Sequence, residues 1–187
     1  MKKSMPYIII ATLVGAGVLA QSLFSPAPQP IIEDTPTTDT PASDGSPIEQ
    51  CAYIWAYHDA DELSALLDAE VKAIDPGASA NVSFYGEDCV YTDGRSTFSA
   101  LETDFYIRKP VNDLTNEDAL GNWISQAMKI VTKIPREQIQ GNYGFVEFWF
   151  EKSDNEQTIV RVQIQQYNEE AQDKKGTELF QFFFKKP

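Results

Sequence analysis

The feature that most constrains the fold is a period of two in the apolar residues of four segments. Residues 81–91, 97–108, 143–152 and 157–167 alternate apolar and polar side chains, as strands with one buried face do. A TDGR sequence separates the first two segments, and an SDNE sequence separates the last two. Both are typical turn sequences. The sequence therefore predicts two antiparallel hairpins, with a bulge at Gly86 in the first.

Helical spacing precedes the first hairpin. A capping signature, SPIE, occupies residues 46–49, and apolar residues then recur every three or four positions until a DPG sequence. We predict one helix over residues 47–74. Asp59 with Glu62 would instead cap a shorter helix and leave residues 51–57 separate.

The helix-and-hairpin pattern occurs twice. A second helical segment, residues 115–134, precedes the second hairpin, and LFQFFFKK at residues 179–186 predicts a final strand. We expect an α+β domain over residues 47–187, with a five-stranded antiparallel sheet and two helices on one face, in the order αββ-αβββ. The repeat fits either a duplication or two uses of a common unit. The face under the helices should hold Val82, Phe84, Leu101, Phe105, Ile107, Val146, Phe148, Phe150, Val160, Val162, Ile164, Phe180, Phe182 and Phe184.

The first residues predict export. Residues 1–24 combine two lysines with an uncharged apolar run, which is typical of a signal peptide cleaved after Ala20 or of an uncleaved membrane anchor over residues 5–24. Residues 25–46 are rich in Pro, Thr and Asp and should form a disordered linker. Either reading makes the domain that follows extracytoplasmic, with the membrane contacted only through the N-terminal segment.

The two cysteines predict a disulfide between Cys51 and Cys89. If the first helix and the strand that follows run antiparallel, both sulfurs arrive at the same end. If the chain is exported, the two cysteines would be oxidised to a disulfide in the compartment outside the cytoplasm. The neighbouring Glu49, Glu87 and Asp88 disfavour a reactive thiolate, so the bond should be structural.

The composition argues against several classes of function. Lys and Arg number 15 against 28 Asp and Glu, a net charge of −13, which disfavours nucleic acid as a partner. One His and two Cys are too few for the usual zinc, haem or iron–sulfur sites. Neither a phosphate-binding loop nor a dinucleotide fingerprint occurs. We expect no cofactor and no bound metal.

His58 is the one candidate centre for chemistry. It lies in an HDADE sequence with Asp59 and Glu62, residue types that bind metals or transfer protons. A solvated acidic helix face explains the same letters, and no nucleophile motif accompanies them. A small envelope enzyme that uses this region, carboxylate-based or metal-assisted, is the alternative to a binding protein.

The sheet face away from the helices is the candidate binding surface. Alternation places aromatic side chains there among acidic and amide groups, a composition found at interaction surfaces. Cross-strand aromatic pairs also stabilise sheets without any ligand. Trp149 would be the natural anchor. The candidate binding residues are Tyr85, Tyr106, Phe145, Trp149 and Phe183.

These observations predict an exported, non-enzymatic binding domain of the cell envelope. Its partner would be another envelope protein, a glycan or a second copy of the chain. A purely structural part of a surface assembly is a further possibility.

Overall fold

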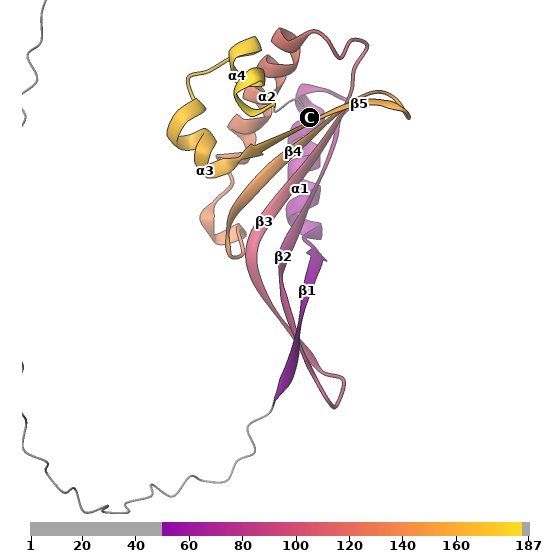
Figure 1. Ribbon diagram of the computed structural model, residues 1–187, viewed down its shortest axis with the longest axis vertical. Coiled ribbons are helices and arrows are strands. Elements are labelled where there is room, and N and C mark those ends of the chain that lie inside the picture. Colours follow the sequence, from indigo (N-terminus) through magenta and orange to yellow (C-terminus); the bar gives the residue numbers. More distant parts are fainter. Residues whose placement is uncertain (1–49, 185–187) are drawn as a thin grey trace, which may run out of the picture. The chain divides into compact units, whose positions relative to one another are not determined.

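The structure is a computed structural model that describes residues 50–184. The expected signal or anchor (residues 1–24) and linker (residues 25–46) lie outside the described residues. None of the helices within residues 50–184 has the length and hydropathy of a membrane span. In chain order the elements are β1 (Cys51–Asp59), α1 (Asp61–Ile74), β2 (Ser79–Tyr91), β3 (Ser96–Pro110), α2 (Glu117–Val131), the 3₁₀ turn Arg136–Gln138, β4 (Asn142–Ser153), β5 (Glu156–Gln163), α3 (Ile164–Gln166) with the π-helical turn Tyr167–Ala171, and α4 (Gly176–Phe183) (Figure 1).

The five strands form one mixed sheet in chain order, β1-β2-β3-β4-β5. Neighbouring strands are antiparallel except β3 and β4, which are parallel. The α+β class is confirmed, and the fully antiparallel arrangement is wrong. The physical reason is that α2 lies between β3 and β4 and returns the chain to the end where β3 began, so β4 runs in the same direction.

Both predicted hairpins form. β2 and β3 pair antiparallel across the turn that contains Gly94, whose φ of 87° suits glycine. The register shifts between Tyr85 and Gly86, where the bulge is predicted. β4 and β5 pair in the same way. Local alternation and turn sequence were therefore sufficient for these four strands.

The chain enters the sheet as a strand, so the prediction of one helix over residues 47–74 is wrong. Residues 51–59 form β1, and α1 begins at Asp61, with Asp61 and Glu62 in its first turn. This agrees with the alternative that leaves residues 51–57 separate. β1 carries aromatic residues at every second position, and pairing with β2 provides partners for its backbone.

The last aromatic segment is a helix, and the predicted final strand is wrong. Leu179, Phe180 and Phe183 are buried at helical spacing on α4, which packs against α2. β5 also ends earlier than predicted, at Gln163, and the chain continues as α3. An aromatic run is compatible with a strand or a helix, and here the α2 surface selects the helix.

One face of the sheet lies against the helices and forms the core. The predicted residues that are buried on these strands are Val82, Phe105, Ile107, Val146, Phe148, Phe150, Val160 and Val162. Leu101 is exposed instead, because the bulge at Gly86 shifts the register beside it. Phe84 is partly buried. Ile164 and Phe180 are buried from helices, and Phe182 and Phe184 pack at the edge of the core.

The predicted disulfide between Cys51 and Cys89 is present, with the two Cα atoms 5.3 Å apart. It joins two neighbouring strands, β1 and β2, and not a helix to a strand as expected. Figure 1 shows that β1 and the hairpin end of β2 and β3 extend past the helices. The disulfide therefore ties together a part of the sheet that the helices do not cover.

Candidate functional site

The sheet face opposite the helices is called here the open face. Its residues lie in rows that run across neighbouring strands. In one row, Tyr57 of β1 pairs with Tyr85 of β2, and Tyr85 pairs with Glu102 of β3. Further rows follow at every second position along the strands. The open face includes Trp55, Tyr57, Tyr85, Glu102, Asp104, Tyr106, Phe145, Glu147, Trp149, Ile159 and Arg161.

Four of the five candidate binding residues lie on the open face: Tyr85, Tyr106, Phe145 and Trp149. Phe183 does not lie there. It belongs to α4 and is buried in the core. Its predicted place on this face is wrong because residues 176–183 are helical, so side-chain alternation does not apply to them.

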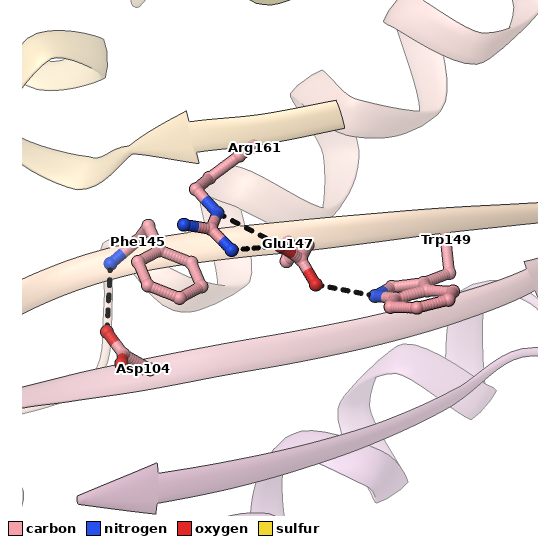
Figure 2. Close-up of polar contacts among 5 residues, drawn as sticks. All are labelled: Asp104, Phe145, Glu147, Trp149 and Arg161. Atoms are coloured by element: carbon pink, nitrogen blue, oxygen red, sulfur yellow. Dashed lines mark hydrogen bonds and ion pairs between the residues drawn. The ribbon is translucent and has the colours of Figure 1, made fainter. Parts of the chain in front are cut away.

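Phe145 and Trp149 already have partners within the chain (Figure 2). Phe145 is only 8% exposed, and the guanidinium of Arg161 lies 4.0 Å from its ring centroid. Trp149 Nε1 donates to Glu147 Oε1 at 2.9 Å, and the Arg108 guanidinium lies 4.5 Å from the indole. Phe145 is therefore buried among these contacts, whereas Trp149 stays partly exposed.

Glu147 and Arg161 form the ion pair at the centre of this region. Arg161 donates from Nε at 2.9 Å and from Nη2 at 2.5 Å to the same oxygen, Oε2 of Glu147. Glu147 is buried, whereas the Arg161 side chain is largely exposed. A buried carboxylate needs such donors to offset its loss of hydration. The positive charge of Arg161 is therefore already engaged with one carboxylate.

Asp104 is a fully buried carboxyl on the open face of β3. Its Oδ1 accepts from the backbone N–H of Phe145 at 3.4 Å, where the β3–β4 register is irregular (Figure 2). Within the part of the chain that the structure describes, Oδ2 has no hydrogen-bond partner. Burial, and then the charge of Glu102, raise the pKa of Asp104 to about 6, although Arg161 and the Phe145 N–H act in the opposite direction.

The most exposed aromatic residues of the sheet are on β1, and sequence reasoning missed them. Tyr53, Trp55 and Tyr57 are 72%, 60% and 63% exposed. The Trp55 ring stacks on Tyr85 with centroids 5.5 Å apart, and Tyr57 lies 4.8 Å from the same ring. The prediction of one helix over residues 47–74 left no place for a strand pattern in this segment. The period of two in Tyr53, Trp55 and Tyr57 was the signal that could have found them.

His58 does not assemble a catalytic group with Asp59 and Glu62. Its Nε2 lies 3.1 Å from Asp88 Oδ2, and its ring stacks on Phe98 at 4.0 Å. Asp59 and Glu62 line a cavity of about 410 Å³ beside α1, and His58 is not part of its lining. Among residues 50–184, no group of three or more His, Cys, Asp or Glu side chains could hold a metal ion.

Comparisons with protein-family models, with curated proteins and with solved structures find no match for this chain. The function is therefore inferred from the side chains of the open face.

Proposed function

We propose that the chain is an exported, non-enzymatic binding domain that recognises another envelope protein through the β1 side of the open face. The observation that carries the proposal is the row of Tyr53, Trp55 and Tyr57, which leaves more than half of each side chain in water. Aromatic residues exposed together on one element are typical of contact surfaces. The Cys51–Cys89 disulfide supports an oxidising, extracytoplasmic location.

The position of β1 at the edge of the sheet adds a second recognition element. Within the described residues, β1 pairs with β2 only, so its outer backbone groups are free. An edge strand of nine residues can pair with an extended segment of another chain, while its aromatic side chains supply specificity. A protein partner uses both features, and for this reason it is preferred to a glycan.

Stability alone is a weak explanation for these rings. Cross-strand pairing with Tyr85 does stabilise β1, but about 0.2–1 kcal/mol per pair is available from such contacts. A smaller or more polar residue on β1 would provide most of this stabilisation and would expose less apolar surface to water. The experiment below separates the two explanations, because a structural role predicts no loss of binding.

The enzyme alternative rests on His58, Asp59 and Glu62, which the structure does not bring together around a common point. His58 is engaged with Asp88 and Phe98 and does not line the cavity that Asp59 and Glu62 share, so we prefer the binding proposal.

The test is capture from envelope extract with the oxidised full-length chain, followed by purification of each captured protein. Affinity for the purified partner is then measured by calorimetry with the wild type and the Trp55→Ala/Tyr57→Ala double variant. The matched control is Trp149→Ala/Ile159→Ala, which removes a Trp and a second apolar residue from the β4–β5 side of the same face.

We expect the β1 variant to weaken binding at least about tenfold, and the control to change it less than threefold. Equal losses in both variants, or no loss in the β1 variant, would show that β1 is not the binding surface. Sedimentation velocity of the two variants reports self-association, and a glycan captured in place of a protein would contradict the choice of partner.

A further inference from the structure

The aromatic rings near β1 lie beside negative charge. Glu102 pairs directly with Tyr85 across β2 and β3, and Asp104 lies two residues further along the same face of β3. Partial desolvation and the charge of Asp104 raise the pKa of the Tyr57 hydroxyl, with smaller contributions from Tyr85 and Glu102. Tyr57 therefore lies within electrostatic reach of both carboxyl groups.

Within residues 50–184, no cation is paired with either of these two carboxyl groups. Among the described residues, Arg161 is the cation that acts on both Asp104 and Tyr57, and it already donates two hydrogen bonds to Glu147. In the described residues, neither an ion pair nor a hydrogen bond reaches the Glu102 carboxylate. Asp104 is fully buried with Oδ2 unpartnered. The β1 side of the open face thus has an excess of negative charge.

A buried carboxyl oxygen without a donor is uncommon and destabilising, and such groups concentrate at functional sites. Replacing Asp104 by a neutral residue would remove the free-energy cost of burying this carboxylate. We therefore look for a functional role that its charge could have. The negative charge of ionised Asp104 near the exposed ring of Tyr57 offers one, because it attracts a cation to the face of that ring.

We propose that Tyr57, Tyr85, Glu102 and Asp104 form a binding site for an alkylammonium group, such as a lysine side chain of the partner protein presents. The inference rests on the proposed function, because it specifies the chemistry that the same surface recognises. The aliphatic part of the ligand packs on the rings, and the ammonium lies over their negative faces. Glu102 is partly exposed and accepts hydrogen bonds directly, while the buried Asp104, two residues along β3, adds its charge without contacting the ligand.

The probe is n-butylammonium, which reproduces the end of a lysine side chain. n-Butanol, the neutral analogue of nearly equal size, is the ligand control. Both are titrated into the oxidised full-length chain at low salt and pH about 8, with NMR shifts of the Tyr57 and Tyr85 rings as the readout. We expect n-butylammonium to saturate with a Kd on the order of 10 mM, and n-butanol to cause no saturable shift.

Two variants test the assignment of the charge. Glu102→Gln should weaken n-butylammonium about three- to fivefold. The matched control, Asp154→Asn, removes an equal charge from the exposed β4–β5 turn and should leave the affinity unchanged. Added NaCl should weaken binding to the wild type, a readout that requires no variant to fold.

Saturable binding of n-butanol with equal affinity, or an unchanged affinity in Glu102→Gln, would overturn the cation site. If n-butylammonium fails to bind while partner capture still depends on Trp55 and Tyr57, the cation site is wrong and the binding domain stands. If capture also persists in the β1 variant, both proposals fail.

Discussion

Asp104 on β3 accepts a hydrogen bond from the backbone N–H of Phe145 on β4 with one oxygen and leaves the other without a partner. The two residues meet where the parallel pairing of β3 and β4 loses its regular register. Asp104 is a buried carboxyl group in contact with the backbone of Phe145, and its charge acts on the neighbouring Tyr106. The burial of Asp104 therefore destabilises the fold, and the same carboxylate supplies charge to the proposed cation site.

Asp104→Asn should stabilise the protein at pH about 8. Burial raises the pKa of Asp104 from 3.8 to about 6, so the unfolded state ionises first as the pH rises. The contribution of Asp104 to the free energy of unfolding is therefore fully present below pH 3.8, and it is lost as the pH rises through about 6. That difference corresponds to about 3 kcal/mol, of which we expect about 1–2 kcal/mol to be recovered, because the asparagine NH₂ has no acceptor there.

The stabilisation by Asp104→Asn is measured by urea unfolding of the wild type and the variant at pH about 4 and about 8. The free energies of unfolding should differ at the higher pH and converge at the lower. A difference that is the same at both pH values would mean that the pKa of Asp104 is not raised by folding.

Binding of n-butylammonium should strengthen as the pH rises from about 5 to about 7.5. Asp104 gains its charge over this range, and a second negative charge increases attraction for the ligand. Calorimetric or NMR titration at several pH values follows the change. Asp104→Asn is the control, in which this part of the pH dependence should disappear. The titratable groups that interact electrostatically with Asp104 are Tyr57 of β1, Glu102 and Tyr106 of β3, Glu147 of β4 and Arg161 of β5. Asp59 of β1 lies in the same cross-strand row, on the far side of Ser83.

Reduction of the Cys51–Cys89 disulfide should release β1 before the rest of the sheet. β1 is an edge strand whose exposed side chains add little burial, so the disulfide contributes much of what holds it. For a loop of 38 residues the chain-entropy contribution is about 4 kcal/mol. Hydrogen exchange of oxidised and reduced protein should show faster exchange in residues 51–57 and little change in β4. Uniform acceleration in all strands would contradict a local role.

Gly121→Ala should displace α4. A Cβ at Gly121 on α2 would collide with the backbone of Gly176, the first residue of α4, because the two helices approach closely there. We expect a loss of at least about 2 kcal/mol of unfolding free energy, despite the better helix propensity of alanine. Chemical denaturation measures it. Gly77→Ala is the matched control, since its nearest neighbour, Asp75 Oδ1, is 3.4 Å away, and it should change stability by less than about 1 kcal/mol.

Sequence alone determined the parts of the fold that depend on neighbouring residues. The alternation around Gly94 and around residues 153–156 specified both hairpins, and their faces followed from it. Tyr85, Tyr106, Phe145 and Trp149 were therefore placed on the open face correctly. The Cys51–Cys89 pairing could be predicted because the chain has only two cysteines.

The tertiary structure decided what contact with distant residues controls. Residues 51–59 carry both a helical and a strand pattern, and the free edge of β2 selected the strand. The aromatic run of α4 suits either state, and the surface of α2 beside Gly121 selected the helix. Only the fold could show that Trp55 and Tyr57 are exposed while Asp104 is buried, because exposure depends on which elements cover a face, and that is fixed by packing between segments far apart in the chain.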